Sequence, residues 1–185
     1  GGMLVQSPYD PDHYEEASLA SRRFALAKHT YFSTFCMYLG ARSVSVEQVD
    51  LRTNTGKTTL DIKGERPVGS AQVTVESSDL ENFRAQMHLL DEFTGGSADL
   101  GAAERLLRRT GLWSDPNMRT LLEMRRDGTN QLTTRRLVLS LSSEAQSNLN
   151  VVGRLKIPAF MKLSAEYDRV VRERHDYTLT VLVKF

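Results

Sequence analysis

The sequence YTLTVLVKF at residues 177–185 alternates apolar and polar side chains. The same alternation runs through RRLVLSL at 135–141 and through LNVVGRLKIPAFMKLSAEY at 149–167. A period of two places successive side chains on opposite faces of a β-sheet. Because one set of positions is apolar and the other is mostly polar, the pattern is typical of antiparallel strands that bury a single face. We therefore predict three or four antiparallel strands in the last third of the chain, with a polar turn at 142–148 between the first two.

The first half of the chain combines a helix with a second group of strands. Apolar residues recur every three or four positions through residues 12–39, which predicts one long helix with a buried stripe. Asp12 is its expected N-cap and Gly40 its expected terminator. Residues 42–75 predict a meander of three strands, the third at 71–75. A change in the phase of the apolar positions predicts a β-bulge near Glu47 in the first of these strands.

Three helices are expected between the two groups of strands. The first begins at the capping box that starts with Ser78 and extends toward residue 93. The second covers about 98–110 and stops at Gly111, and the third begins at Ser114 or Asp115 and ends before residue 127.

Strands that are grouped, rather than alternating one by one with helices, indicate an α+β fold. We predict an antiparallel sheet of about six to seven strands in two groups, packed against four helices of which the N-terminal one is long. Residues 1–11 are expected to form a disordered lead-in. Residues 12–185 are expected to form a single domain, a length sufficient to bury a core.

The composition limits the classes of function. The chain has 24 basic and 23 acidic residues, so its net charge of +1 argues against a dedicated nucleic-acid binder. Cys36 is the single cysteine, which excludes an intramolecular disulfide and favours a reducing compartment. No apolar run approaches the roughly 20 residues of a membrane-spanning helix. We therefore expect a cytoplasmic protein and do not expect a membrane partner.

Motifs that carry chemistry are weak in this sequence. The tripeptide at 56–58, Gly-Lys-Thr, matches the end of a phosphate-binding loop, but Leu51 replaces the required glycine and residues 58–62 alternate like a strand. The four histidines lack metal-ligand spacing, and Cys36 lies between apolar residues in the middle of a predicted helix. We predict no catalytic, cofactor-binding or metal-binding residues and no small-molecule substrate. An enzyme of a class without a linear motif remains open.

The function that the sequence favours is a non-enzymatic module for protein binding or self-assembly. The last strand, if it lies at a sheet edge, is expected to pair with another chain. The long N-terminal helix offers a second contact through its aromatic stripe, for which packing into the core is the alternative. The expected partner-binding residues are Tyr31, Phe35, Tyr38, Val181, Val183 and Phe185.

Two alternatives belong to other classes. Arginine doublets at Arg108, Arg109, Arg125, Arg126, Arg135 and Arg136 are expected to contact the phosphate backbone of a nucleic acid if they meet on one surface. The long alternating run at 149–167 is expected to serve a membrane-attaching or pore-forming oligomer if its apolar face meets lipid.

Overall fold

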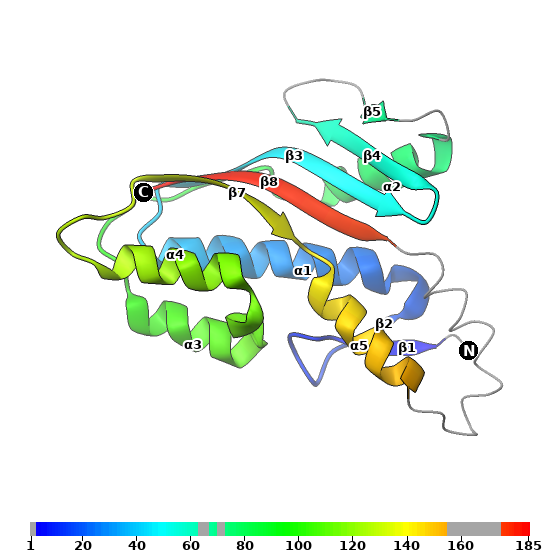
Figure 1. Ribbon diagram of the computed structural model, residues 1–185, viewed down its shortest axis with the longest axis horizontal. Coiled ribbons are helices and arrows are strands. Elements are labelled where there is room, and N and C mark those ends of the chain that lie inside the picture. The colour runs from blue at the N-terminus through cyan, green and yellow to red at the C-terminus, as the bar shows by residue number, and fades with distance from the viewer. Residues whose placement is uncertain (1–2, 63–66, 70–72, 155–174) are drawn as a thin grey trace.

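The computed structural model describes residues 3–62, 67–69, 73–154 and 175–185. Within them an antiparallel sheet of six strands lies over the helix α1 (Ala17–Tyr38), which confirms the predicted α+β class (Figure 1). The strand order is β5–β4–β3–β8–β7, and β6 pairs with β3 beside β4. These strands are β3 (Ser43–Thr53), β4 (Gly56–Asp61), β5 (Pro67–Gly69), β6 (Leu90–Glu92), β7 (Thr134–Ser140) and β8 (Asp176–Lys184).

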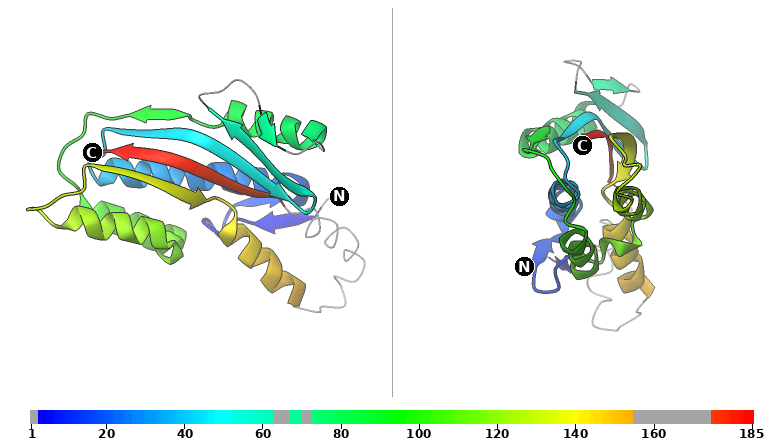
Figure 2. Two further views of the ribbon diagram at one scale, coloured as in Figure 1. Left: turned by 45° about the horizontal axis from the view of Figure 1, so that its top comes forward. Right: turned by 90° about the vertical axis from the view of Figure 1, so that its left-hand side faces the viewer.

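β3 is the central strand of this sheet. It pairs with β8 along one side, whereas β4 and β6 share its other side (Figure 2). The register with β8 shifts between Val46 and Gln48, which confirms the predicted bulge. The extra residue lets Val46 and Val49 both point into the core, although they are an odd number of positions apart.

β8 confirms the strand predicted at the C-terminus, but it does not lie at a sheet edge, which was the condition for its pairing with another chain. It is paired with β3 on one side and with β7 on the other. Val181 and Val183 are fully buried, and the guanidinium of Arg125 lies 4.4 Å from the centre of the Phe185 ring. Because the backbone groups of β8 are used on both sides, this strand cannot accept another chain.

The strand predicted at 71–75 is also wrong where the structure describes it. From Val73 the chain forms α2 (Val73–Gln86), so the predicted capping box at Ser78 lies inside a helix. Leu80 and Phe83 of α2 are fully buried, and the Phe83 ring stacks on Tyr177 at 4.3 Å between centroids. Burial of this helical face outweighs the β-propensity of the valines that precede it.

The residues after α2 differ from the prediction as well. Residues 90–92 form the strand β6 rather than the end of a helix, and Leu90 is 54% exposed. This segment pairs with β3, and the N–H of Val46 donates to the carbonyl of Leu89 at 2.8 Å.

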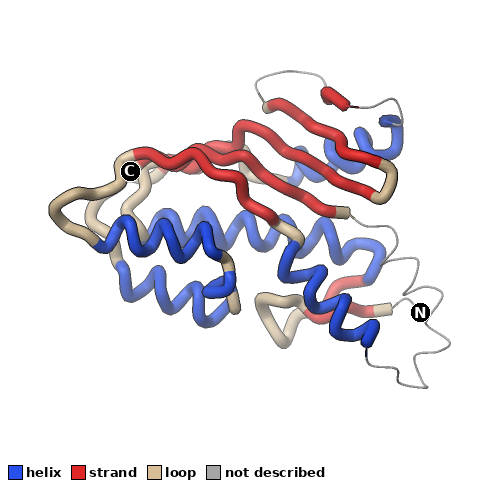
Figure 3. The backbone as a smooth tube through the Cα atoms, in the orientation of Figure 1, coloured by secondary structure: helices blue, strands red, loops and turns tan. Residues whose placement is uncertain are grey.

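The polar turn predicted at 142–148 is wrong, because α5 (Ser143–Arg154) begins there (Figure 3). Glu144 stands in its first turn, where the helix dipole favours negative charge, and the N–H of Gln146 donates to the carbonyl of Ser142. The strand predicted from residue 149 is therefore wrong up to Arg154. The remainder of that run, 155–167, lies outside the described residues. Among the described residues, no helix combines the length and the apolar character needed to cross a bilayer.

The N-terminal segment, expected to be disordered, forms the strand β1 (Leu4–Gln6), which pairs with β2 (Tyr14–Glu16). α1 therefore starts at Ala17, and Asp12 does not cap it. The N–H of Ala17 instead donates to the carbonyl of Met3 at 2.8 Å. The predicted terminator Gly40 is confirmed, with a φ of 85° after the last turn of α1.

Two further helices keep their predicted limits closely. α3 (Leu100–Thr110) is capped by Asp99 and stops at Gly111, whose φ of 74° is left-handed. A short 3₁₀ turn, η1 (Leu112–Ser114), leads to α4 (Pro116–Arg126). α3 lies on the side of α1 that faces away from the sheet (Figures 1 and 2).

A buried lysine connects these layers. Lys28 on α1 is fully buried, and its Nζ lies 2.7 Å from Asp115 Oδ2 and 2.9 Å from Glu144 Oε1. It also donates to the carbonyl of Ser140 at 2.6 Å. The other oxygen of Asp115 accepts from the backbone of α4, and the Tyr9 hydroxyl donates to Glu144. One ammonium thus joins α1, α4, the end of β7 and α5.

The substitution Lys28→Met tests this connection. It leaves the buried Asp115 carboxylate and the partly buried Glu144 carboxylate without their cation, so we expect the free energy of unfolding to fall by about 3–5 kcal/mol. Urea denaturation followed by circular dichroism measures this loss. Lys57→Met is the control, because Lys57 is half exposed and 3.5 Å from Asp50, and it should cost under about 1 kcal/mol. Equal losses in the two variants would contradict a connecting role for Lys28.

Candidate functional site

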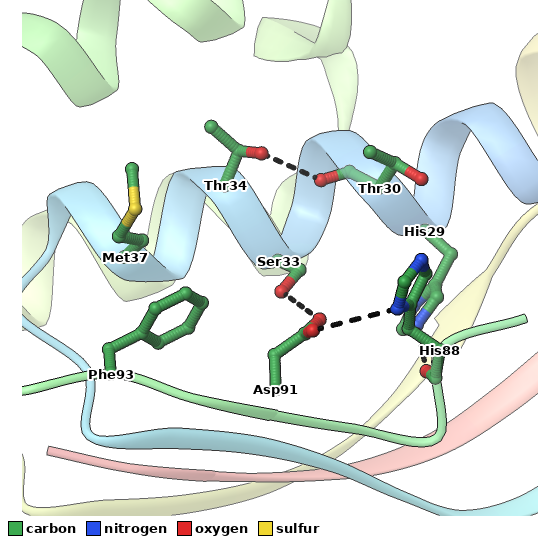
Figure 4. Close-up of a pocket in the computed structure, with 8 residues that line it drawn as sticks. All are labelled: His29, Thr30, Ser33, Thr34, Met37, His88, Asp91 and Phe93. Atoms are coloured by element: carbon green, nitrogen blue, oxygen red, sulfur yellow. Dashed lines mark hydrogen bonds and ion pairs between the residues drawn. The ribbon is translucent and has the colours of Figure 1, made fainter.

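A pocket of about 190 Å³ lies between α1 and the segment that leads through β6 (Figure 4). α1 contributes one wall, because residues three and four apart fall on the same helix face. The chain from residue 88 to residue 93 contributes the other. The residues that line the pocket are His29, Thr30, Ser33, Thr34, Met37, His88, Asp91 and Phe93.

The polar end of the pocket is built around Asp91. The Ser33 hydroxyl donates to Asp91 Oδ2 at 2.6 Å. His88 Nδ1 lies 4.0 Å from Asp91 Oδ1, and the His88 side chain is 76% exposed (Figure 4). The Asp91 carboxylate therefore lies near the solvent. Its Oδ2 accepts a hydrogen bond from Ser33, and its Oδ1 can accept a further one.

His29 forms the buried part of the same wall. Its Nε2 lies 2.8 Å from the carbonyl oxygen of His88. A carbonyl only accepts, so Nε2 carries the proton, and Nδ1 is a buried acceptor without a hydrogen-bond partner in the described structure. Burial lowers the pKa of His29, which keeps the ring neutral near pH 7.

The other end of the pocket is apolar. Met37 is 40% exposed there, and the ring of Phe93 is partly buried against the core. The hydroxyls of Thr30 and Thr34 donate to backbone carbonyls one turn earlier in α1, at 3.2 and 3.0 Å. The pocket thus runs from a thioether and a phenyl ring to a carboxylate.

This arrangement suits binding better than nucleophilic catalysis. A serine nucleophile needs a base that accepts its proton, usually a histidine oriented by a third group. Here Ser33 donates to a carboxylate, and the proton of His29 points to a backbone carbonyl. Cys36 is fully buried in α1, and desolvation raises the pKa of its thiol, so this sulfur is not a reactive thiolate.

The aromatic stripe predicted on α1 does not form one exposed surface. Phe35 is fully buried in the core, which is the alternative that the sequence left open. Tyr31 and Tyr38 are partly buried, and the Tyr31 ring packs edge-on against Tyr9 at 5.7 Å.

The arginine doublets lie on three different elements. Arg108 and Arg109 are in the last turn of α3, Arg125 and Arg126 are in the last turn of α4, and Arg135 and Arg136 are on β7.

Several of these arginines are already engaged. Arg125 is buried and donates to the carbonyl of Leu132 at 2.8 Å, whereas Arg136 pairs with Glu47 at 2.8 Å. Arg108 stacks over Trp113 at 4.3 Å. Contacts within the chain thus already hold three of the six arginines predicted to contact phosphate.

Sequence reasoning missed the pocket because it placed residues 87–93 on a helix. His29 and His88 gave no signal in the sequence, because the four histidines lack metal-ligand spacing. Ser33 and Asp91 carried no signal, because their 58-residue separation is bridged only by the pairing of β6 with β3.

Comparison with protein-family models, with curated proteins and with solved structures finds no match to this chain. The assignment of function therefore depends on the geometry of the site.

His29 makes stability depend on pH. Because burial lowers the pKa of the folded state below the usual value of about 6.5, the unfolded chain binds more protons in mildly acidic solution. Stability should therefore decrease as the pH falls from 7 to 5.5. We expect His29→Gln, whose amide can still donate to the His88 carbonyl, to show a smaller decrease, as measured by urea denaturation at the two pH values.

His13→Gln is the matched control, because His13 is exposed, and this variant should keep the full decrease. A pH dependence that is identical in wild type and His29→Gln would show that another group causes it.

Proposed function

We propose that the protein is a non-enzymatic protein-binding module whose contact surface is the outer edge of β6 together with the pocket beneath it. The observation that carries this proposal is that the pocket opens beside a strand at the edge of the sheet. A strand edge supplies backbone hydrogen bonds to an added strand, and an adjacent pocket supplies side-chain specificity.

The backbone directions on β6 support strand addition. Leu89 and Phe93 bond toward β3, through Val46 N to Leu89 O at 2.8 Å and Phe93 N to Arg42 O at 2.7 Å. Because alternate residues of a strand point their N–H and C=O groups to opposite sides, those of Leu90 and Glu92 point away from β3. β6 therefore offers a short ladder of two residues to a partner.

Exposed apolar side chains flank this edge. Leu90 lies on the open face of the sheet, and Met37 lies on the α1 side next to the pocket. An added strand would cover parts of both, since its side chains alternate between the two faces. Burial of apolar area would add to the backbone hydrogen bonds.

The opposite edge of the sheet, β7, is less suited to strand addition. The carbonyl of Val138 accepts from the Asn117 side chain at 3.0 Å, and the carbonyl of Ser140 accepts from Lys28 at 2.6 Å. Capped edge groups are one of the ways in which proteins prevent edge-to-edge pairing. This contrast favours β6 as the contact.

Two further aspects of the proposal follow from the sequence. We propose a cytoplasmic location, because Cys36 is the single cysteine and the fold does without a disulfide.

Nucleic-acid binding through the arginine doublets is the alternative proposal, and it requires an affinity that weakens steeply with salt. Membrane attachment, the other alternative, requires leakage of liposomes.

Photo-cross-linking tests the β6 contact directly. We expect Leu90→p-benzoylphenylalanine to give a discrete covalent adduct when cells expressing the protein are irradiated, because a bound partner lies within reach of this side chain. Denaturing gel electrophoresis and mass spectrometry measure the adduct. An adduct of twice the chain mass would identify self-assembly, and another mass would identify a second protein.

Met124→p-benzoylphenylalanine is the control, because Met124 is an exposed residue of α4, away from β6. The proposal fails if position 90 gives no adduct or gives only the adducts that position 124 gives.

A further inference from the structure

We infer that the pocket between α1 and β6 receives an arginine or lysine side chain from an extended segment of the partner. This inference rests on the proposed function, and it adds the chemical class of residue that the module recognises. It follows from the charge of the pocket, from its shape and from its position relative to β6.

The charge of the pocket is negative at one end. Asp91 Oδ2 accepts from Ser33 at 2.6 Å, whereas Oδ1 is 4.0 Å from His88 Nδ1, which is beyond hydrogen-bond distance. The described lining includes no lysine or arginine, and His29 is neutral. A cationic donor from outside would therefore complete the hydrogen bonding of this carboxylate.

The shape of the pocket suits a long side chain with a charged end. A cavity of about 150 Å³ holds one benzene ring, so a volume of about 190 Å³ accepts a single large side chain. Arginine and lysine pack their apolar stems against apolar surface and direct their charged heads to polar groups. Met37 and Phe93 would contact the stem, and Asp91 would accept from the charged head.

The position of Asp91 fixes which partner residue enters. Asp91 is paired with Val44, whose side chain is buried, so both residues face α1. A strand added to β6 would lie about 4.8 Å away and would direct alternate side chains toward α1. The side chain opposite Asp91 is then the one that reaches the pocket, as a cross-strand pair of opposite charge.

Selection of peptides tests this inference. Phage-displayed random octapeptides are panned on the immobilised full chain, and the best peptide is synthesised for titration by fluorescence polarisation. We expect enriched peptides to carry arginine or lysine at one fixed position. Replacing that residue by a neutral analogue of similar shape, citrulline for arginine or norleucine for lysine, should weaken binding about tenfold to hundredfold, because one charged hydrogen bond is lost.

A double-mutant cycle assigns the effect to Asp91. The variant Asp91→Asn keeps an acceptor for Ser33 but removes the charge. It should reduce the affinity for the basic peptide by a similar factor, and its affinity for the neutral peptide should equal that of wild type. Glu123→Gln removes the same charge from an exposed position of α4, away from β6, and it should change the affinity less than about fivefold. Replacement of the peptide residue keeps the test valid even if a protein variant is unstable.

The outcomes separate this inference from the proposed function. Enriched peptides that lack a fixed basic residue but lose binding to Met37→Glu would overturn the inference and leave the β6 contact standing. Basic peptides that bind wild type, Asp91→Asn and Glu123→Gln alike would also overturn it. If no peptide is enriched, or if binding is unaffected by Met37→Glu, the inference and the proposed function both fail.

Discussion

The buried ammonium of Lys28 is the contact on which the arrangement of the layers depends. A charge without water is tolerated only where oppositely charged and polar groups surround it, so Asp115, Glu144 and the Ser140 carbonyl must all converge on α1. This requirement places the start of α4 and the start of α5 beside the same turn of α1. It also occupies an outward carbonyl of β7, so one cluster organises the layers and closes part of a sheet edge.

The two sides of α1 have different roles because adjacent helical residues point about 100° apart. Lys28 reaches toward α4 and α5, whereas His29, the next residue, lines the pocket on the other side of the helix. Buried positions on α1 accordingly include Lys28, His29 and Ser33 as well as aromatic residues. A single apolar stripe does not describe such a helix, since polar side chains are buried wherever they have partners.

The positions of the Ser33 hydroxyl proton and the His29 ring proton determine which hydrogen-bonding groups the pocket offers to a ligand. Ser33 donates to a carboxylate and His29 Nε2 donates to a carbonyl, so the Ser33 hydroxyl is not hydrogen-bonded to a histidine. What remains is acceptor capacity on Asp91 next to Met37 and Phe93. Beside the edge of β6, this combination is suited to recognising a side chain on an added strand. The sheet topology makes this recognition available, because β6 is the outermost strand beside the first residues of β3, whereas the far edge strand β7 is capped.

The sequence by itself determined the features whose causes are local. Asp99 and Asp115 cap their helices, Gly40 and Gly111 end theirs, and the phase change near Glu47 marks the bulge of β3. These depend on residues a few positions apart, so a linear pattern contains the information. Alternation identified β7 and β8 for the same reason.

Only the tertiary structure decided which residues became α2, β6 and α5, and which strand lay at an edge. Val73 to Ser77 and the polar residues after Ser142 have local preferences that packing overrides, because burial of a helix face contributes more than propensity. The partners of Lys28 are 87 to 116 residues away, and Asp91 is 58 residues from Ser33. No local pattern encodes such pairs, so both the connecting cluster and the candidate site exist only once the sheet has brought distant segments together.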